Sequence, residues 1–358
     1  MRALQRRFYD MGINSHAIIR QAGESTESVS FCYFQAESES VIIKFFLRAY
    51  EKIAVNLGLI KLSIIQRKMF MIAKEKISNE TKGIVVSTPE PDLIHLARYI
   101  KKRYPKINLI VDIRDGIYYE SLSKNNPFLR FLNSRIEKIV CKEADAIVTV
   151  NPELSDFYQK KTRSPVIMIA NGFAREWNIP LPTPSSQCIR ILYAGRISKS
   201  RKNLLLSLST LEDALMKAKR VSLRFVGDFD FMEKERLSKI GEVKDSVPHE
   251  ELYEHYAWAD YLLLFTGDET SVTTLKFFDY LATGRKIIHI GNGSFVKRIL
   301  EKEKLGWTVG INEKMCLEKL FVHLSSKRCV EVNSYEDVAK YNLDKIMSQY
   351  IRMLKKLD

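Results

Sequence analysis

The stretch SVTTLKFFDYLATGRKIIHIG, residues 271–291, places a lysine and an acid at the start of a helical pattern that leads into a β-branched run. Lys276 and Asp279 are three residues apart and therefore share one face of a helix. A lysine beside the unpaired N–H groups of a helix start suits a phosphate, and a carboxylate accepts hydrogen bonds from sugar hydroxyls. The alternative is a solvated surface pair, which contributes only roughly 0.2–0.5 kcal/mol. We favour the ligand-binding interpretation.

A second group of cations follows a predicted strand in YAGRISKSRKNLLLSL, residues 193–208. Gly195 ends the strand, Arg196 follows it, and Lys202 precedes a helical run. A glycine lets the backbone approach a ligand, and two cations beside a helix start suit a diphosphate. Basic residues in a loop are usually solvated, so a diphosphate site at this turn is favoured only in combination with the sequence that follows it.

Short β-branched runs alternate with longer helical patterns along almost the whole chain, which is typical of β-α-β units and parallel sheets. A length of 358 residues also favours two domains. Strands are expected at about 14–20, 29–34, 84–88, 107–113, 146–150, 166–170, 189–194, 221–227, 261–265, 286–290 and 307–311. We therefore predict an α/β fold of two Rossmann-like, doubly wound domains that face a central cleft.

The Pro- and Ser-rich segment 179–187 is the expected linker. It separates an N-terminal domain over 1–178 from a C-terminal domain over 188–340. Residues 341–358 are expected to form a C-terminal helix, and one alternative is that this helix packs back on the first domain.

The chain carries 57 Lys and Arg against 43 Asp and Glu, a formal charge of +14, so an anionic partner is expected. Nucleic acid is disfavoured, because the basic residues do not alternate with exposed aromatics on a recognisable module. The five cysteines are scattered without a C-x-x-C pair, which predicts neither disulfides nor a zinc site and fits a cytoplasmic setting. The sequence predicts no signal peptide and no membrane span.

Basic residues also recur within segment 41–77. Lys44, Arg48 and Lys52 follow one another at intervals of four, so they share one face of a predicted amphipathic helix. Such a helix can lie on an anionic bilayer. Peripheral attachment to the inner face of the cell membrane and simple packing on the first domain are equal alternatives.

Several motifs follow one another in an order that resembles a known family. RFVGDFD, VPHEELYEHYAWADYLLLFT, the 271–291 stretch and EKLGWTVGI resemble, over about 189–311, the C-terminal domain of retaining, nucleotide-sugar-dependent glycosyltransferases of group 1, which have the GT-B fold. STPEPDLIHLARYIKKRYPKINLIVDIRD (87–115), EADAIVTVNPEL (143–154) and IANGF (169–173) extend the resemblance over most of the chain.

The resemblance implies a donor site in the second domain. Arg196 and Lys202 would bind the donor diphosphate, with Arg201 as a competitor of Lys202. The family's two acids fall at Ser271 and Asp279, so the first is replaced and the second would hold the ribose. Lys276 in LKFFDY fits a lysine-bearing variant of this helix. The full expected donor-binding set is Gly195, Arg196, Arg201, Lys202, Val247, His249, Ser271, Thr273, Thr274, Lys276 and Asp279, with Val247 and His249 beside the base.

The resemblance further implies transfer of a sugar, with retention of configuration, from a nucleoside-diphosphate sugar to a saccharide or lipid-linked saccharide acceptor in cell-envelope polysaccharide biosynthesis. The catalytic candidates are Arg196, Lys202 and Asp115; the last faces the expected cleft, although a strand-end or capping role is the alternative. No metal and no cofactor are expected, and DFD at 228–230 is interpreted as unrelated to metal binding.

A non-catalytic GT-B partner or binding subunit of a glycosylation complex is the alternative function. Two features motivate it. Ser271 replaces the first acid, and the chain begins inside what looks like the first helix, so the usual first strand and its glycine-rich loop are missing.

Overall fold

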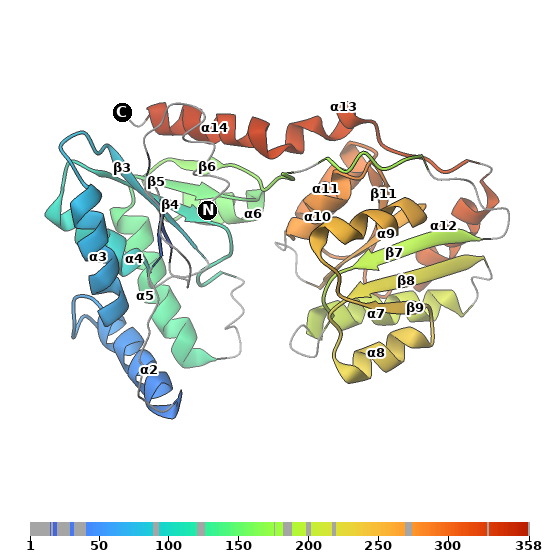
Figure 1. The fold of residues 1–358 in the computed structure, drawn as a ribbon, viewed down its shortest axis with the longest axis horizontal. Coiled ribbons are helices and arrows are strands. Elements are labelled where there is room, and N and C mark those ends of the chain that lie inside the picture. Colours follow the sequence, from blue (N-terminus) through green and yellow to red (C-terminus); the bar gives the residue numbers. More distant parts are fainter. Residues whose placement is uncertain are drawn as a thin grey trace. The chain divides into compact units, whose positions relative to one another are not determined.

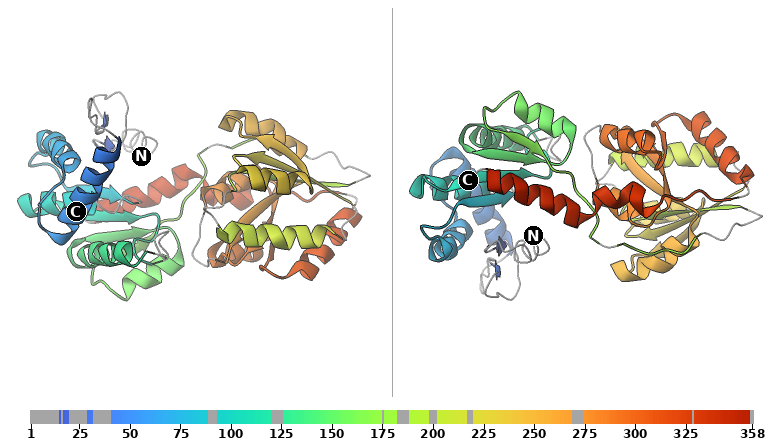
Figure 2. Two further views of the ribbon diagram at one scale, coloured as in Figure 1. Left: turned by 90° about the horizontal axis from the view of Figure 1, so that it is seen from below. Right: turned by 90° about the horizontal axis from the view of Figure 1, so that it is seen from above.

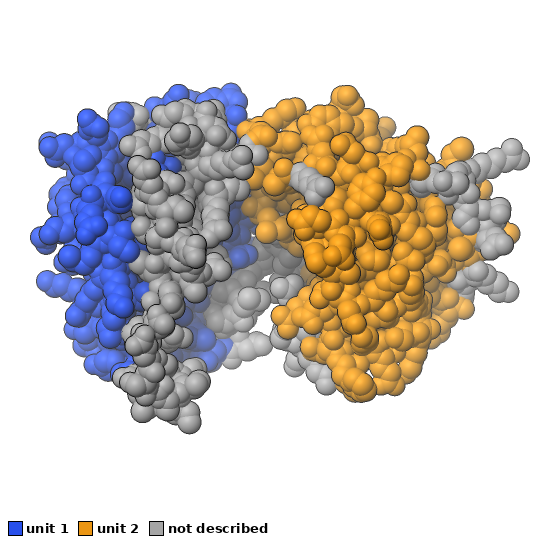
Figure 3. Space-filling view, in the orientation of Figure 1, with its two compact units in different colours: residues 1–170, 347–358 blue, residues 171–346 orange. Residues whose placement is uncertain are grey.

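The computed structural model describes residues 15, 17–19, 29–31, 41–88, 93–119, 126–174, 176–181, 188–197, 202–216, 220–268, 274–327 and 329–356, with only the backbone described at 19, 29–31, 41–46, 48, 202 and 203. The chain divides into two compact units (Figure 3). Unit 1 comprises residues 1–170 and 347–358, and unit 2 comprises residues 171–346. Both contain parallel sheets with helices, so the predicted α/β class is confirmed.

Unit 2 contains a six-stranded parallel sheet in the order β12-β11-β10-β7-β8-β9. Figure 1 labels β7, β8, β9 and β11 of this sheet. Its strands are β7 (Ile189–Ala194), β8 (Val221–Gly227), β9 (Glu242–Asp245), β10 (Tyr261–Gly267), β11 (Lys286–Gly291) and β12 (Gly306–Val309). This is the doubly wound order, in which the winding direction reverses between β7 and β10. Ligands of such sheets bind outside the carboxyl ends of the strands at that reversal.

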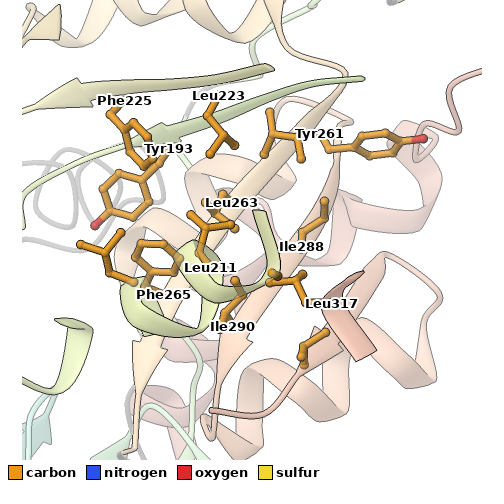
Figure 4. Packing of buried hydrophobic residues seen from close by; sticks show 14 of the residues in the cluster. Tyr193, Leu211, Leu223, Phe225, Tyr261, Leu263, Phe265, Ile288, Ile290 and Leu317 are labelled. Carbon is orange, nitrogen blue, oxygen red and sulfur yellow. The ribbon is translucent and has the colours of Figure 1, made fainter. Parts of the chain in front are cut away.

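Helices lie on both faces of this sheet (Figure 2). They are α7 (Lys202–Leu215), α8 (Phe231–Ser238), α9 (Leu252–Trp258), α10 (Leu275–Leu281), α11 (Ser294–Lys302), α12 (Lys314–Ser326) and α13 (Tyr335–Val338). Leu211 of α7 and Leu317 of α12 share one buried cluster with Leu263 of β10 and Ile288 of β11 (Figure 4). Every residue of β10 is buried, as expected for a central parallel strand covered on both sides.

Unit 1 contains a four-stranded parallel sheet in the order β3-β4-β5-β6. Its strands are β3 (Gly83–Ser87), β4 (Asn108–Ile113), β5 (Ala146–Thr149) and β6 (Val166–Met168), and its helices are α2 (Val41–Leu57), α3 (Ile64–Lys76), α4 (Leu93–Arg103), α5 (Pro127–Glu143) and α6 (Pro152–Gln159). The short strands β1 (Ala17–Ile19) and β2 (Val29–Phe31) form a separate parallel pair. Within the described ranges, β3 is therefore an edge strand of its sheet. The expected N-terminal helix over residues 1–12 lies outside the described residues.

The chain leaves unit 1 earlier than the sequence suggested, because unit 2 begins at Asn171 and residues 171–174 and 176–178 pack within it. The N–H of Phe173 donates to the carbonyl of Tyr341 at 3.0 Å, and the N–H of Trp177 donates to the carbonyl of Ala282 at 3.3 Å. Both side chains are buried, and burial of two large aromatics fixes the segment to unit 2. Of the expected linker 179–187, residues 182–187 lie outside the described ranges. The final helix, α14 (Leu343–Lys356), starts in unit 2, and its residues from Met347 onward belong to unit 1.

Candidate functional site

The turn after β7 brings Gly195 against a lysine that is distant in sequence. Gly195 has a φ of +146°, which L-residues rarely adopt. A Cβ atom at this position would lie 2.1 Å from the Nζ atom of Lys276, so only a glycine leaves room for the ammonium group. That ammonium group lies 4.0 Å from the centroid of the Tyr193 ring. The structure thus joins the two motifs that the sequence singled out, at the carboxyl end of β7.

Helix α10 presents Lys276 on one side while most of its other residues are buried. The Thr274 hydroxyl caps the helix by accepting from the N–H of Lys276 at 3.3 Å. Phe277, Phe278 and Tyr280 are fully buried, so these side chains anchor the helix in the core of unit 2. Lys276 and Asp279 lie on its half-buried side.

Arg196 extends from the same turn and is exposed. Its guanidinium group pairs with Asp228 at 3.4 Å, and both side chains are more than half accessible. Asp228 follows β8, so the acid of the DFD motif contacts an arginine. Within the part of the chain that the structure describes, no group of three or more His, Cys, Asp or Glu side chains could hold a metal ion.

Four predicted site residues are described by backbone alone or lie outside the described residues. Lys202 is the first residue of α7, but only its backbone is described. Arg201, Ser271 and Thr273 lie outside the described residues. Their roles stay predictions.

Asp279, His249 and two aromatic rings form a second group in unit 2. Burial raises the pKa of the Asp279 carboxyl, and nearby His249 opposes that shift. The exposed His249 ring lies 4.9 Å from the ring of Trp177, which in turn lies 5.0 Å from that of Tyr256. Val247 is half-buried two residues before His249. A half-buried carboxylate beside an exposed imidazole can accept hydrogen bonds from hydroxyl groups, and the imidazole, backed by the two buried rings, can contact a planar ring.

Trp177 was missed by the sequence analysis. It lies in a Pro-rich stretch without helical or strand periodicity, so its contact with His249 follows only from the fold. The one available signal was a large aromatic residue, a type that contributes most when buried.

The two acids after β4 differ in their surroundings. Asp112 is almost fully buried and pairs with the Nε atom of Arg114 at 2.8 Å. Burial raises its pKa, and Arg114 opposes that shift. Asp112 therefore has a structural role near the end of β4. Asp115 is exposed, although partial desolvation raises the pKa of its carboxyl.

The basic face predicted on α2 is described only in part. Lys52 is exposed, whereas the side chains of Lys44 and Arg48 are not described. Exposed apolar side chains follow in the α2–α3 connection, where Leu59 is 71% accessible, and at the start of α3, where Ile64 is 45% accessible. Among the described residues, no helix is both long and apolar enough to cross a bilayer.

Comparison with known proteins shows similarity at the level of structure. No family model matches the chain, and no curated protein matches it. Sucrose-phosphate synthase from Thermosynechococcus elongatus superimposes with a TM-score of 0.69 at 14% identity, covering 99% of this chain and 92% of that protein. The lipopolysaccharide outer core galactosyltransferase WaaB superimposes with a TM-score of 0.66 at 12% identity, covering 99% and 94%.

A third similar structure is the pneumococcal O-GlcNAc transferase GtfA, solved in complex with UDP and GlcNAc. It superimposes with a TM-score of 0.55 at 12% identity, covering 82% of this chain and 60% of that protein. At such identities the likeness concerns the fold. The chain has the GT-B fold that the sequence predicted.

Proposed function

We propose that this protein is a glycosyltransferase that moves a sugar from a nucleoside-diphosphate sugar to a saccharide acceptor. The observation that carries the proposal is the position of the Lys276 ammonium group over Gly195, at the strand end where a doubly wound sheet reverses its winding. A cation beside a glycine turn suits a diphosphate. GtfA, which shares the fold, was solved with a nucleoside diphosphate and a sugar.

The diphosphate is proposed to lie on the Gly195–Arg196 turn, between Arg196 and Lys276. Arg196 must exchange Asp228 for phosphate, and an exposed pair of this kind contributes only about 0–1 kcal/mol, so the exchange costs little. Lys202, at the start of α7, and its neighbour Arg201 are the remaining candidate cations.

The nucleoside is proposed to extend from there along α10. Asp279 lies one helical turn beyond Lys276 and would accept hydrogen bonds from the ribose hydroxyls. His249 and Val247 would flank the base, and Thr274 with the unlocated Ser271 and Thr273 would approach the sugar and the phosphates.

Catalysis is proposed to consist mainly of charge stabilisation. As the bond between the sugar and the diphosphate breaks, negative charge develops on the departing phosphate oxygen. Arg196, Lys202 and Lys276 would hold that charge without a metal ion. The acceptor hydroxyl would attack from the leaving-group face with retention of configuration and give up its proton to the departing phosphate oxygen. Asp115 is the candidate from unit 1 for a contact with the acceptor or the sugar.

The acceptor is proposed to be a saccharide, or a lipid-linked saccharide presented at an anionic membrane surface on the cytoplasmic side. The support is the exposed Lys52 on α2 together with the exposed apolar residues Leu59 and Ile64. The backbone N–H of Ile64 donates to Glu51 of α2, which places the start of α3 beside that helix. Basic residues beside exposed apolar ones match a headgroup layer over hydrocarbon.

The donor site is tested by calorimetric titration with UDP, GDP, ADP, TDP and CMP. We expect one of these nucleotides to bind. Lys276→Met should lower the affinity for that nucleotide by tenfold or more, since it removes a charged contact of about 1.5–3 kcal/mol. Lys286→Met is the matched control. Lys286 also lies near an aromatic ring, Trp307, but at the start of β11, the opposite edge of the sheet. Absence of binding to every nucleotide, or equal losses in both variants, would contradict the proposal and favour a non-catalytic partner.

Membrane attachment is tested by flotation with liposomes of anionic lipid. We expect the protein to float and the triple change of Lys44, Arg48 and Lys52 to glutamate to prevent it. The control carries the same charge change at Lys239, Lys314 and Lys319, which are exposed on unit 2. If wild type and the first variant float equally, or if neither floats, attachment through this helix is wrong.

A further inference from the structure

Strands β7 and β10 stop pairing before either strand ends. Their ladder pairs Tyr261 with Ile191 and Leu262 with Leu192, and no later pair follows, although β7 continues to Ala194 and β10 to Gly267. Beyond this point β7 remains paired with β8, and β10 with β11. The separation coincides with the reversal of the winding, where the donor site is proposed.

The separation leaves the backbone of Ala194 without a strand partner on the β10 side. The N–H of the next residue, Gly195, donates to Val226 of β8 at 2.8 Å. In a strand the N–H and C=O groups of one residue point to the same side, and successive residues alternate sides, so the N–H and C=O groups of Ala194 point toward β10. Buried backbone groups of this kind need partners.

The hydroxyl of Tyr280 supplies both partners. It accepts from the N–H of Ala194 at 2.8 Å and donates to the carbonyl of Ala194 at 3.2 Å. Tyr280 is fully buried and belongs to α10, one residue after Asp279 and one turn after Lys276. One phenol thus replaces the missing strand at a single residue.

We propose that Tyr280 is a positioning residue that keeps β7 and β10 apart and holds α10 in register with the Gly195 turn. This proposal rests on the proposed donor site for its consequence in binding, but its structural part stands by itself. Because the hydroxyl bonds the residue directly before Gly195, it fixes Lys276 and the glycine turn relative to each other. The diphosphate contacts, more than the nucleoside contacts, should therefore depend on it.

The test is Tyr280→Phe, which keeps the ring and removes both hydrogen bonds. We expect amide hydrogen exchange at Ala194 to accelerate by roughly tenfold or more, the effect of losing one buried hydrogen bond. We also expect the affinity gained between a nucleoside monophosphate and its diphosphate, measured with the UMP–UDP, GMP–GDP, AMP–ADP and TMP–TDP pairs, to shrink about tenfold while monophosphate affinity is retained.

Tyr341→Phe is the matched control, since it also removes one tyrosine hydroxyl from unit 2. The Tyr341 hydroxyl donates to Glu303 at 2.8 Å, just after α11 and before β12 begins, at the opposite edge of the sheet. This variant is expected to lower the stability of unit 2 and to leave both Ala194 exchange and the diphosphate gain unchanged. A general loss of packing would instead change Ala194 exchange and the diphosphate gain in both variants alike, and that result would overturn the proposal.

The measurements separate this proposal from the proposed function. If wild type binds none of the nucleotides, the donor site fails, and exchange at Ala194 still decides the role of Tyr280. If Tyr280→Phe does not fold, amide exchange in wild type decides the role of Tyr280. The amide of Ala194 must then be as strongly protected as that of Leu192, which lies inside the β7–β10 ladder. Fast exchange at Ala194 in wild type, or an undiminished diphosphate gain in a folded variant, would overturn the proposal.

Discussion

Replacing Gly195 with alanine tests whether the glycine turn and Lys276 form one unit. A φ of +146° strains any residue with a Cβ, at a cost of about 1–3 kcal/mol. The added Cβ would also lie 2.1 Å from the Nζ atom and 2.5 Å from the Cε atom of Lys276. Because a lysine side chain is flexible, it would move away and lose its position over the Tyr193 ring, a contact worth roughly 0.5–2 kcal/mol.

These two terms can be separated by a double-mutant cycle with Lys276→Ala. Gly195→Ala should destabilise unit 2 by roughly 1.5–5 kcal/mol in the wild-type background, the sum of strain and displacement. In the Lys276→Ala background the displacement term is already lost, so only the strain of about 1–3 kcal/mol remains. The expected coupling between the two positions is therefore about 0.5–2 kcal/mol.

Urea unfolding of the four proteins, followed by circular dichroism, gives the free energies. Separate unfolding of the two units would be treated as two transitions, of which the one belonging to unit 2 is compared. If the two substitutions add within about 0.5 kcal/mol, they do not interact, and the contact between Lys276 and the turn is wrong. Diphosphate affinity should fall in all three variants, because each one displaces or removes the ammonium group.

Three further predictions concern unit 2. Burial, with a smaller effect of Lys297, lowers the pKa of His289 to about 3. Between about pH 6.5 and pH 3 the unfolded chain therefore binds a proton that the folded chain does not. Stability should therefore fall as pH falls through this window, by up to about 1.4 kcal/mol per pH unit, and urea titrations of His289→Gln should lack that contribution. Asp260→Ala should destabilise unit 2 by about 3 kcal/mol, because it removes the buried carboxylate that pairs with Arg190 at 2.7 Å. Calorimetry should find nucleotide affinity unchanged, since this pair lies at the amino ends of the strands. Nucleotide binding beside Asp279 should change tryptophan fluorescence in wild type and not in Trp177→Phe, and an equal change in both would refute a nucleoside site at His249.

Local sequence pattern located most of the elements in unit 2. Strands β7 and β8 occupy the predicted residues 189–194 and 221–227, because buried parallel strands are short apolar runs bounded by turn residues. Strand β9 was missed. Its residues, EVKD, are mostly charged, and as the edge strand of the sheet it needs no apolar run.

The sequence by itself also singled out Gly195, Arg196, Lys276 and Asp279, because residue type and position at a strand end or helix start are local properties. Tertiary structure decided their partners. Strand order places α10 against the end of β7, so that Lys276 lies over Gly195 and Tyr280 bonds Ala194. Contacts between distant segments depend on how strands are ordered and how helices pack, and no local periodicity specifies either one. That is also why the ring of Trp177 beside His249 could be found only in the folded chain.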